Sequence, residues 1–150
     1  MGLACDYVVG KEGVVLNPHY QTLGLSGSEY HTYTLPKRVG KVMAESLLNE
    51  CLPLSVEKAK ALGMIDEVYA HETYYESLHH FAASVYNEEY IWDKQEYLEE
   101  HREQIEALKE KELEIMHPEF WETDSSFHRL RQEFVYKVCP RETPKRLKKW

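Results

Sequence analysis

The segment GLSGSEYHTY, residues 24–33, places Ser26 and Glu29 three positions apart. This spacing is typical of a capping box. In that motif the serine side chain accepts a hydrogen bond from the N3 amide, and the glutamate side chain accepts one from the N-cap amide. The same carboxylate could instead serve as an acid or base at the mouth of a pocket, beside the hydroxyl groups of Tyr20, Tyr30 and Tyr33. Both interpretations of Glu29 are open at this point.

The elements before and within this segment are short. The apolar runs CDYVVG and GVVL, the second over residues 13–16, predict two buried strands. A helical pattern begins at Ser28, and Pro36 should break or restart it. An amphipathic helix should follow and end at Pro53, since six apolar residues share one helical face: Val39, Val42, Met43, Leu47, Leu48 and Cys51.

A short helix and a strand complete the first part of the chain. Ser55 is placed to cap the helix in SVEKAKALG, and Gly63 to follow its last residue. The segment MIDEVYA then predicts a terminal strand or extended segment. Residues 1–69 therefore form one unit with short strands and helices.

The amino-acid composition of residues 70–150 predicts a helical extension. The pattern over residues 71–116 predicts a long helix rich in Glu and Tyr, which Pro118 should end. A cluster of cap residues at 124–126 then predicts a last amphipathic helix, which Pro140 ends. Its apolar stripe is Phe127, Leu130, Phe134, Val135 and Val138. The chain is thus predicted to be α/β and mostly helical.

Charge and composition exclude several classes of protein. The formal net charge of -8 argues against a general nucleic-acid binder. Residues 85–116 carry eleven acids and four bases, whereas residues 129–150 carry eight bases and two acids. A solvated helix face with a basic tail explains this pattern, and so does a basic arm for an anionic partner. No apolar run is long enough to span a membrane.

Cysteine and histidine positions predict neither a disulfide framework nor a metal site. The three cysteines, Cys5, Cys51 and Cys139, are unclustered and form no CxxC pair. His79 and His80 are neighbours and cannot share a helix face, although either lies three or four positions from Glu76. We expect no metal and a reducing cytoplasm as the location.

Four ordered motifs resemble the C-terminal half of the crotonase (enoyl-CoA hydratase/isomerase) superfamily. LACDYVV resembles its Leu-Ala-x-Cys-Asp strand, and NPHYQTLGLSG its Pro-Glu-x-x-x-Gly-x-x-Pro-Gly turn. LPKRVGKVMAESLL and PLSVEKAKALGMIDEVY resemble the helix and the Ser-Ala-x-Glu-Ala segment that follow. The family often carries a catalytic Glu after the proline of the turn, where this chain has His19. Ordinary hydratase chemistry is therefore not implied.

The stretch VVLNPHYQTLGLSGSEYHTYTLPKRVG and the tail DSSFHRLRQEFVYKVCP resemble one branch of this superfamily, which serves NiFe-hydrogenase maturation. That resemblance implies a crotonase-like domain that splits formyl-CoA into CO and coenzyme A. A folate formyl donor would be used only by a domain upstream of it. The implied partners are the CoA thioester and the hydrogenase maturation machinery, with no nucleic acid and no membrane.

The same resemblance assigns roles to single residues. It implies that Glu29 is the acid/base and that Tyr20 orients the substrate or donates a proton. His19 and His31 could bind substrate or shuttle protons. Ser26 and Gly27 could present amides to the thioester.

The family's oxyanion-hole glycines lie before the Leu-Ala-x-Cys-Asp strand, where this chain begins. We therefore expect a C-terminal fragment that is a poor catalyst alone. Two alternatives are a conventional acyl-CoA hydratase or isomerase and a non-catalytic helical interaction module. The acidic helix and the missing oxyanion segment favour the second alternative for the isolated chain.

Overall fold

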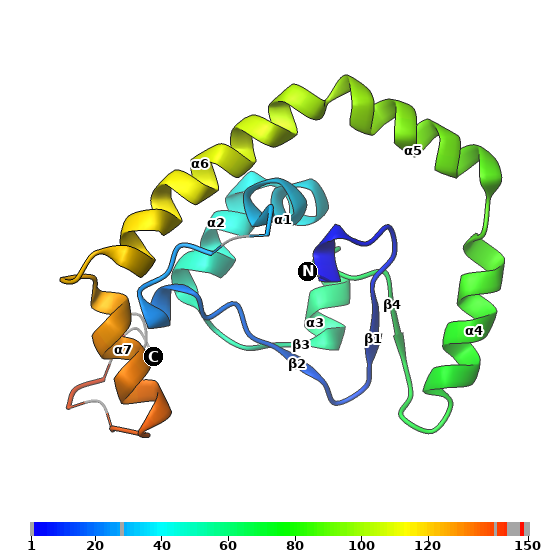
Figure 1. The fold of residues 1–150 in the computed structure, drawn as a ribbon. Coiled ribbons are helices and arrows are strands. Elements are labelled where there is room, and N and C mark those ends of the chain that lie inside the picture. Colours follow the sequence, from blue (N-terminus) through cyan, green and yellow to red (C-terminus); the bar gives the residue numbers. More distant parts are fainter. Residues whose placement is uncertain (1, 28, 140, 144–147, 149–150) are drawn as a thin grey trace.

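The computed structural model describes residues 2–27, 29–139, 141–143 and 148. Three successive helices form an arch over two shorter ones (Figure 1). The arch consists of α4 (Tyr74–Val85), α5 (Glu88–Glu100) and α6 (Arg102–Trp121). Beneath it lie α1 (His31–Val39) and α2 (Lys41–Glu50), with α3 (Val56–Ala61) beside them. The last helix, α7 (Ser126–Val135), packs against α6 and the 3-10 turn η2 (Gln21–Leu23).

Four short strands make two two-stranded pairs. β1 (Val9–Lys11) runs parallel to β4 (Glu67–Tyr69), and β2 (Val15–Leu16) runs antiparallel to β3 (Leu54–Ser55). The predicted strands therefore exist, but the prediction that they are buried is wrong. β1 is half-buried, and Val15 of β2 is 59% exposed. Each strand has one ladder partner among the described residues, so its other edge and part of its surface stay uncovered.

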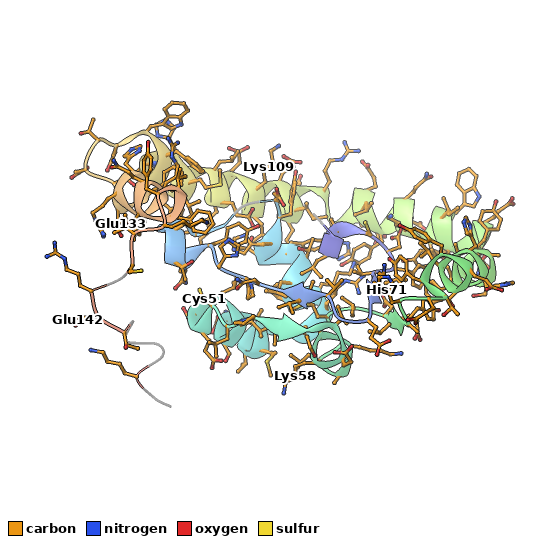
Figure 2. All side chains as sticks on the ribbon, turned by 90° about the horizontal axis from the view of Figure 1, so that it is seen from below. Cys51, Lys58, His71, Lys109, Glu133 and Glu142 are labelled. Carbon is orange, nitrogen blue, oxygen red and sulfur yellow. The ribbon has the colours of Figure 1, made fainter. Side chains whose placement is uncertain are left out.

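The core lies between α1, α2 and α3. It is made of seven buried apolar residues: Leu35, Ala44, Leu47, Val56, Ala59, Met64 and Ile65. Gly10 of β1 lets the strand approach this core closely. A Cβ at that position would lie 2.8 Å from Ile65 Cδ1 and 2.9 Å from Val56 Cγ1. In Figure 2, Lys58 of α3 and Lys109 of α6 lie at opposite sides of the molecule.

The boundary between the first two helices differs from the prediction. Pro36 lies inside α1 rather than at a break, and the chain bends at Gly40, which has φ +79°. Pro36 removes one backbone hydrogen bond, whereas the left-handed conformation at Gly40 cannot continue a helix. Val42 was placed on the buried face of the second helix but is 83% exposed, because the break at Gly40 resets the helical phase.

The predicted caps of the next helix are confirmed. Ser55 Oγ accepts the Lys58 amide at 3.2 Å, and Gly63 has φ +75° after the helix end. The segment MIDEVYA contains β4, as expected. These features depend on residues only a few positions apart.

The predicted long helix is three helices. Asn87 starts α5 because its side chain accepts the Glu89 amide at 2.9 Å, and the chain breaks again at His101. Pro118 does not end the helix, which continues to Trp121. Ser125 caps α7 as predicted, accepting the Phe127 amide at 3.3 Å. Pro140 lies outside the described residues, and α7 ends before it at Val135.

The predicted fold class is confirmed, because the fold is mixed α/β and mostly helical. None of the described helices is long and apolar enough to cross a membrane. The described residues contain no cluster of three or more metal-binding side chains. Cys5, Cys51 and Cys139 form no disulfide among the described residues.

Candidate functional site

Tyr20 lies at the start of the turn η2, which packs against α7. Tyr20 carbonyl oxygen accepts the amides of Leu23 and Leu25, at 3.0 and 3.1 Å. Gly24 closes this turn with φ +72°. The turn fixes the backbone of Tyr20 and leaves its side chain half-buried.

Gly27 brings Tyr20 and His31 together. The two rings lie 6.1 Å apart, centroid to centroid. A Cβ on Gly27 would lie 3.1 Å from Tyr20 Cδ2 and 3.2 Å from His31 Cε1, and Gly27 has φ +90°. Both the space and the backbone conformation therefore require glycine. The predicted residues Tyr20, Gly27 and His31 form one contact group.

Glu29 lies in an exposed turn just before α1. Glu29 has φ +68° and Tyr30, the N-cap residue of α1, has φ +57°. Neither is glycine, so the surroundings must hold this left-handed pair in place. The structure therefore places Glu29 at the surface of this chain, on a turn of defined shape.

The capping-box interpretation of Ser26 and Glu29 is wrong. The cap of α1 comes from Glu112 of α6, whose Oε2 accepts the Tyr30 amide at 2.9 Å. Its Oε1 accepts the Thr32 amide at 2.8 Å and the Thr32 hydroxyl at 2.5 Å. Glu112 is only 6% exposed. A distant carboxylate thus performs the role that the local spacing suggested for Glu29.

Ser26 is bound to a second glutamate of α6. The Ser26 amide donates to Glu119 Oε2 at 2.9 Å, and the Ser26 hydroxyl donates to Glu119 Oε1. In this conformation the Ser26 amide, which was expected to meet a thioester, already donates to Glu119. Substrate binding by Ser26 stays a prediction that requires Glu119 to release it.

The two predicted histidines have different surroundings. His19 is exposed, and its Nδ1 lies 2.9 Å from the Asn17 carbonyl oxygen. His31 is largely buried, with Nδ1 3.2 Å from Glu112 Oε1. That Nδ1 makes no hydrogen bond within the described residues. His31 therefore belongs to the group around Tyr20, whereas His19 lies at its edge.

The electrostatics of the group favour a neutral tyrosine. Partial burial raises the pKa of the Tyr20 hydroxyl, and the negative charges of Glu29 and Glu112 raise it further. Tyr20 therefore keeps its proton at neutral pH and can donate a hydrogen bond. It lies close enough to Glu29 for their charges to interact. The arrangement thus combines a hydroxyl donor with a nearby carboxylate.

Sequence reasoning missed Glu112 and Glu119. Both lie in a helix rich in glutamate, seven positions apart, and therefore on one face of α6. Nothing in the local sequence separates them from exposed neighbours such as Glu114. Their seven-residue spacing is the one signal that could have indicated a shared face.

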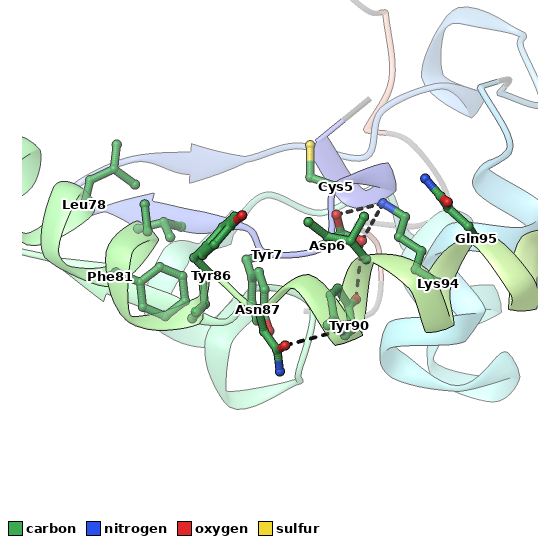
Figure 3. A pocket seen from close by; sticks show the side chains of 14 residues that line it. Cys5, Asp6, Tyr7, Leu78, Phe81, Tyr86, Asn87, Tyr90, Lys94 and Gln95 are labelled. Carbon is green, nitrogen blue, oxygen red and sulfur yellow. Dashed lines mark hydrogen bonds and ion pairs between the residues drawn. The ribbon is translucent and has the colours of Figure 1, made fainter.

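A separate pocket lies between the N-terminal segment and the helices α4 and α5 (Figure 3). Its volume is about 510 Å³, and Tyr7 and Phe81 form part of its apolar wall. Lys94 and Asp6 form an ion pair of 2.7 Å at one end. None of the six predicted site residues contributes to its described lining. The candidate site is instead the surface group around Tyr20 and Glu29.

Comparison with known proteins identifies related sequences. The model of the enoyl-CoA hydratase/isomerase family matches residues 1–137. The hydrogenase maturation factor HoxX of Bradyrhizobium diazoefficiens is 32% identical to this chain over 152 aligned positions. The alignment covers 96% of this chain but 27% of HoxX.

Solved structures show the same relationship. A variant of HypX from Aquifex aeolicus superposes with a TM-score of 0.84 and is 36% identical. HypX in complex with tetrahydrofolic acid superposes with a TM-score of 0.81 and is 35% identical in sequence. Each comparison covers 97% of this chain and 27% of HypX. An enoyl-CoA hydratase/isomerase from Pseudoalteromonas atlantica, 21% identical with a TM-score of 0.76 over 94% of this chain and 57% of that enzyme, shares the fold.

Proposed function

Because this chain belongs to the enoyl-CoA hydratase/isomerase family, we propose that it supplies part of an active site for a coenzyme A thioester. The chain spans about a quarter of the length of HoxX and HypX, 27% in both. We propose further that the thioester is formyl-CoA, which is split into CO and CoA for hydrogenase maturation. The similarity to HoxX and HypX supports this choice.

The observation that carries the proposal is the pairing of Tyr20 with Glu29. A protonated hydroxyl lies within electrostatic range of a carboxylate, on a turn with a fixed left-handed backbone. A carboxylate can take a proton and return it, and a neutral hydroxyl can hold the oxygen or sulfur of a thioester. These are the two functions that cleavage of a formyl thioester needs.

In the proposed reaction Glu29 is the only group that carries a proton. The Glu29 carboxylate takes the formyl hydrogen as a proton, and the electron pair of the C–H bond remains on carbon. The C–S bond breaks and its electron pair goes to sulfur, which releases CO. Glu29 then returns the proton to the thiolate, which gives CoA and restores the carboxylate. Tyr20 donates a hydrogen bond to the substrate throughout.

The remaining predicted residues have supporting roles in this proposal. Gly27 and His31 shape the contact surface of Tyr20. His19 is exposed, so it could meet the polar end of the thioester. The folate formyl donor would act in another part of a longer protein, as suggested by the complex of HypX with tetrahydrofolic acid.

The test uses a chimera in which this chain replaces the matching segment of Aquifex aeolicus HypX. Formyl-CoA is supplied directly, and CO is detected by the carbonyl spectrum of added haemoglobin. Free CoA is measured with a thiol reagent in the same sample. Crotonyl-CoA is tested in parallel by the loss of its enoyl absorbance.

We expect CO and free CoA in equal amounts from formyl-CoA, and no turnover of crotonyl-CoA. Hydration of crotonyl-CoA without CO release would show that the site is that of a conventional hydratase. A folded chimera that turns over neither thioester would support the non-catalytic interaction module. Circular dichroism establishes that the chimera is folded before either conclusion is drawn.

A further inference from the structure

The turn before α1 has a backbone that needs external support. Glu29 and Tyr30 are consecutive non-glycine residues with φ +68° and +57°. Such a pair is unfavourable because each Cβ approaches its own carbonyl oxygen. It persists where the surrounding structure holds it, often at functional sites. We therefore expect contacts from other parts of the chain to Tyr30 and to the residues that follow it.

Glu112 provides those contacts. Its carboxylate accepts two backbone amides, from Tyr30 and Thr32, and one hydroxyl, from Thr32. The two amides flank His31, so the carboxylate spans the first turn of α1. Glu112 is 6% exposed and lies at the positive end of the helix dipole, which stabilises its charge. The contact therefore fixes where α1 begins and how the preceding residues enter it.

We propose that Glu112 of α6 is the positioning residue of this site, because its carboxylate accepts the amides of Tyr30 and Thr32 and so holds the backbone turn that carries Glu29. This inference rests on the proposed function for its catalytic consequence. The conformational part stands on the contacts alone. Glu112 touches neither the thioester nor the transferred proton.

The electrostatic consequence separates positioning from simple packing. The charge of Glu112 contributes to the raised pKa of the Tyr20 hydroxyl. A variant that keeps the fold but removes this charge should change both the turn and the proton affinity of Tyr20. An unrelated loss of stability would change neither in the folded protein. Glu114 is exposed on the same helix and offers a matched control.

The first test is an NMR comparison of this chain with its Glu112→Gln and Glu114→Gln variants. In the wild type we expect the Tyr30 and Thr32 amides to be protected from hydrogen exchange. Glu112→Gln should reduce this protection by roughly tenfold or more and lower the Tyr20 pKa. Glu114→Gln should leave both unchanged. Unchanged amides and an unchanged Tyr20 pKa in folded Glu112→Gln would overturn the proposal.

The second test measures kcat and KM in the HypX chimera. Glu112→Gln should lower kcat by about 10-fold to 100-fold, because a small displacement of a reacting group has effects of this size. KM for the thioester should change by less than about twofold. Glu112→Asp, which keeps the charge on a shorter side chain, should recover part of kcat. Equal kcat in wild type and folded Glu112→Gln would overturn the catalytic part of the proposal.

The two tests separate this inference from the proposed function. A wild-type chimera that releases no CO contradicts the proposed function, while the NMR comparison still decides whether Glu112 holds the turn. If Glu112→Gln does not fold, Glu112→Asp is examined in the same two ways. Its shorter reach should weaken the protection of Tyr30 and Thr32, and full protection would contradict the proposal.

Discussion

The Ser26 amide donates a 2.9 Å hydrogen bond to Glu119, which lies 93 positions later in the chain. The Ser26 hydroxyl donates to the same carboxylate. Together with the contacts of Glu112, this interaction ties the loop that carries Tyr20 to α6. The helical extension and the first part of the chain therefore share one structural unit around the candidate site.

Replacing Glu119 with Gln should weaken this link. The amide side chain cannot accept both donors of Ser26 as a carboxylate does, and hydrogen bonds to charged acceptors are the stronger kind. We expect the free energy of unfolding to fall by about 1–3 kcal/mol, measured by urea denaturation. The matched variant Glu114→Gln, on the exposed face of the same helix, should change it by less than about 0.5 kcal/mol. Equal values for the two variants would show that the Ser26 contact does not stabilise the fold.

Arg38 should resist replacement by lysine. Its guanidinium donates to Asp66 Oδ2 at 3.0 Å and to the carbonyl oxygens of Cys5 and Asp6, at 2.9 and 3.1 Å. Lysine cannot reproduce this planar set of donors. Arg38→Lys should therefore reduce the free energy of unfolding by about 1–3 kcal/mol in a thermal melt.

The same substitution at Arg102 is the control. Arg102 makes a surface ion pair with Glu99 and its side chain is 67% exposed. Such pairs contribute little, so Arg102→Lys should change stability by less than about 1 kcal/mol. A larger loss at Arg102 than at Arg38 would contradict the importance of the Asp66 network.

Tyr20 predicts a specific pH dependence of stability. Burial, with the charges of Glu29 and Glu112, raises the pKa of its hydroxyl in the folded state. Above about pH 10 the unfolded chain releases this proton first, so the free energy of unfolding falls as pH rises. Tyr20→Phe removes this term, so its free energy of unfolding should fall less steeply than that of the wild type from about pH 10 upward. Tyr90 and Tyr97 also have a raised pKa, but they contribute equally to both proteins. Parallel pH profiles would contradict the assignment to Tyr20.

The sequence predicted the elements whose signals are local. Ser55 was identified as a cap, and the cap of the last helix was placed within residues 124–126, because a capping side chain and the amide that donates to it lie within three positions. The crotonase motifs, read in order, indicated the mixed fold of the first 69 residues. The effect of both prolines was predicted wrongly, because α1 continues past Pro36 and α6 past Pro118 although each proline removes one backbone hydrogen bond.

The geometry of the candidate site could not be predicted in the same way. Tyr20, Gly27 and Glu29 lie close together in the sequence and could be identified from one short segment. The cap of α1, however, comes from Glu112, 80 positions beyond Thr32. A local rule could offer only the nearest glutamate, Glu29, as a candidate for the cap. The roles of all six predicted site residues stay predictions until activity is measured.

The most direct test of the central claim is the rate of CO release by the HypX chimera carrying Glu29→Gln. Glutamine has nearly the same shape as glutamate but cannot accept and return the formyl proton. We predict a loss of about 100-fold to 10,000-fold in kcat, with circular dichroism unchanged. The control Glu45→Gln, exposed on α2, should retain the wild-type rate. A Glu29→Gln chimera that releases CO as fast as the wild type would contradict the assignment of Glu29 as the acid/base.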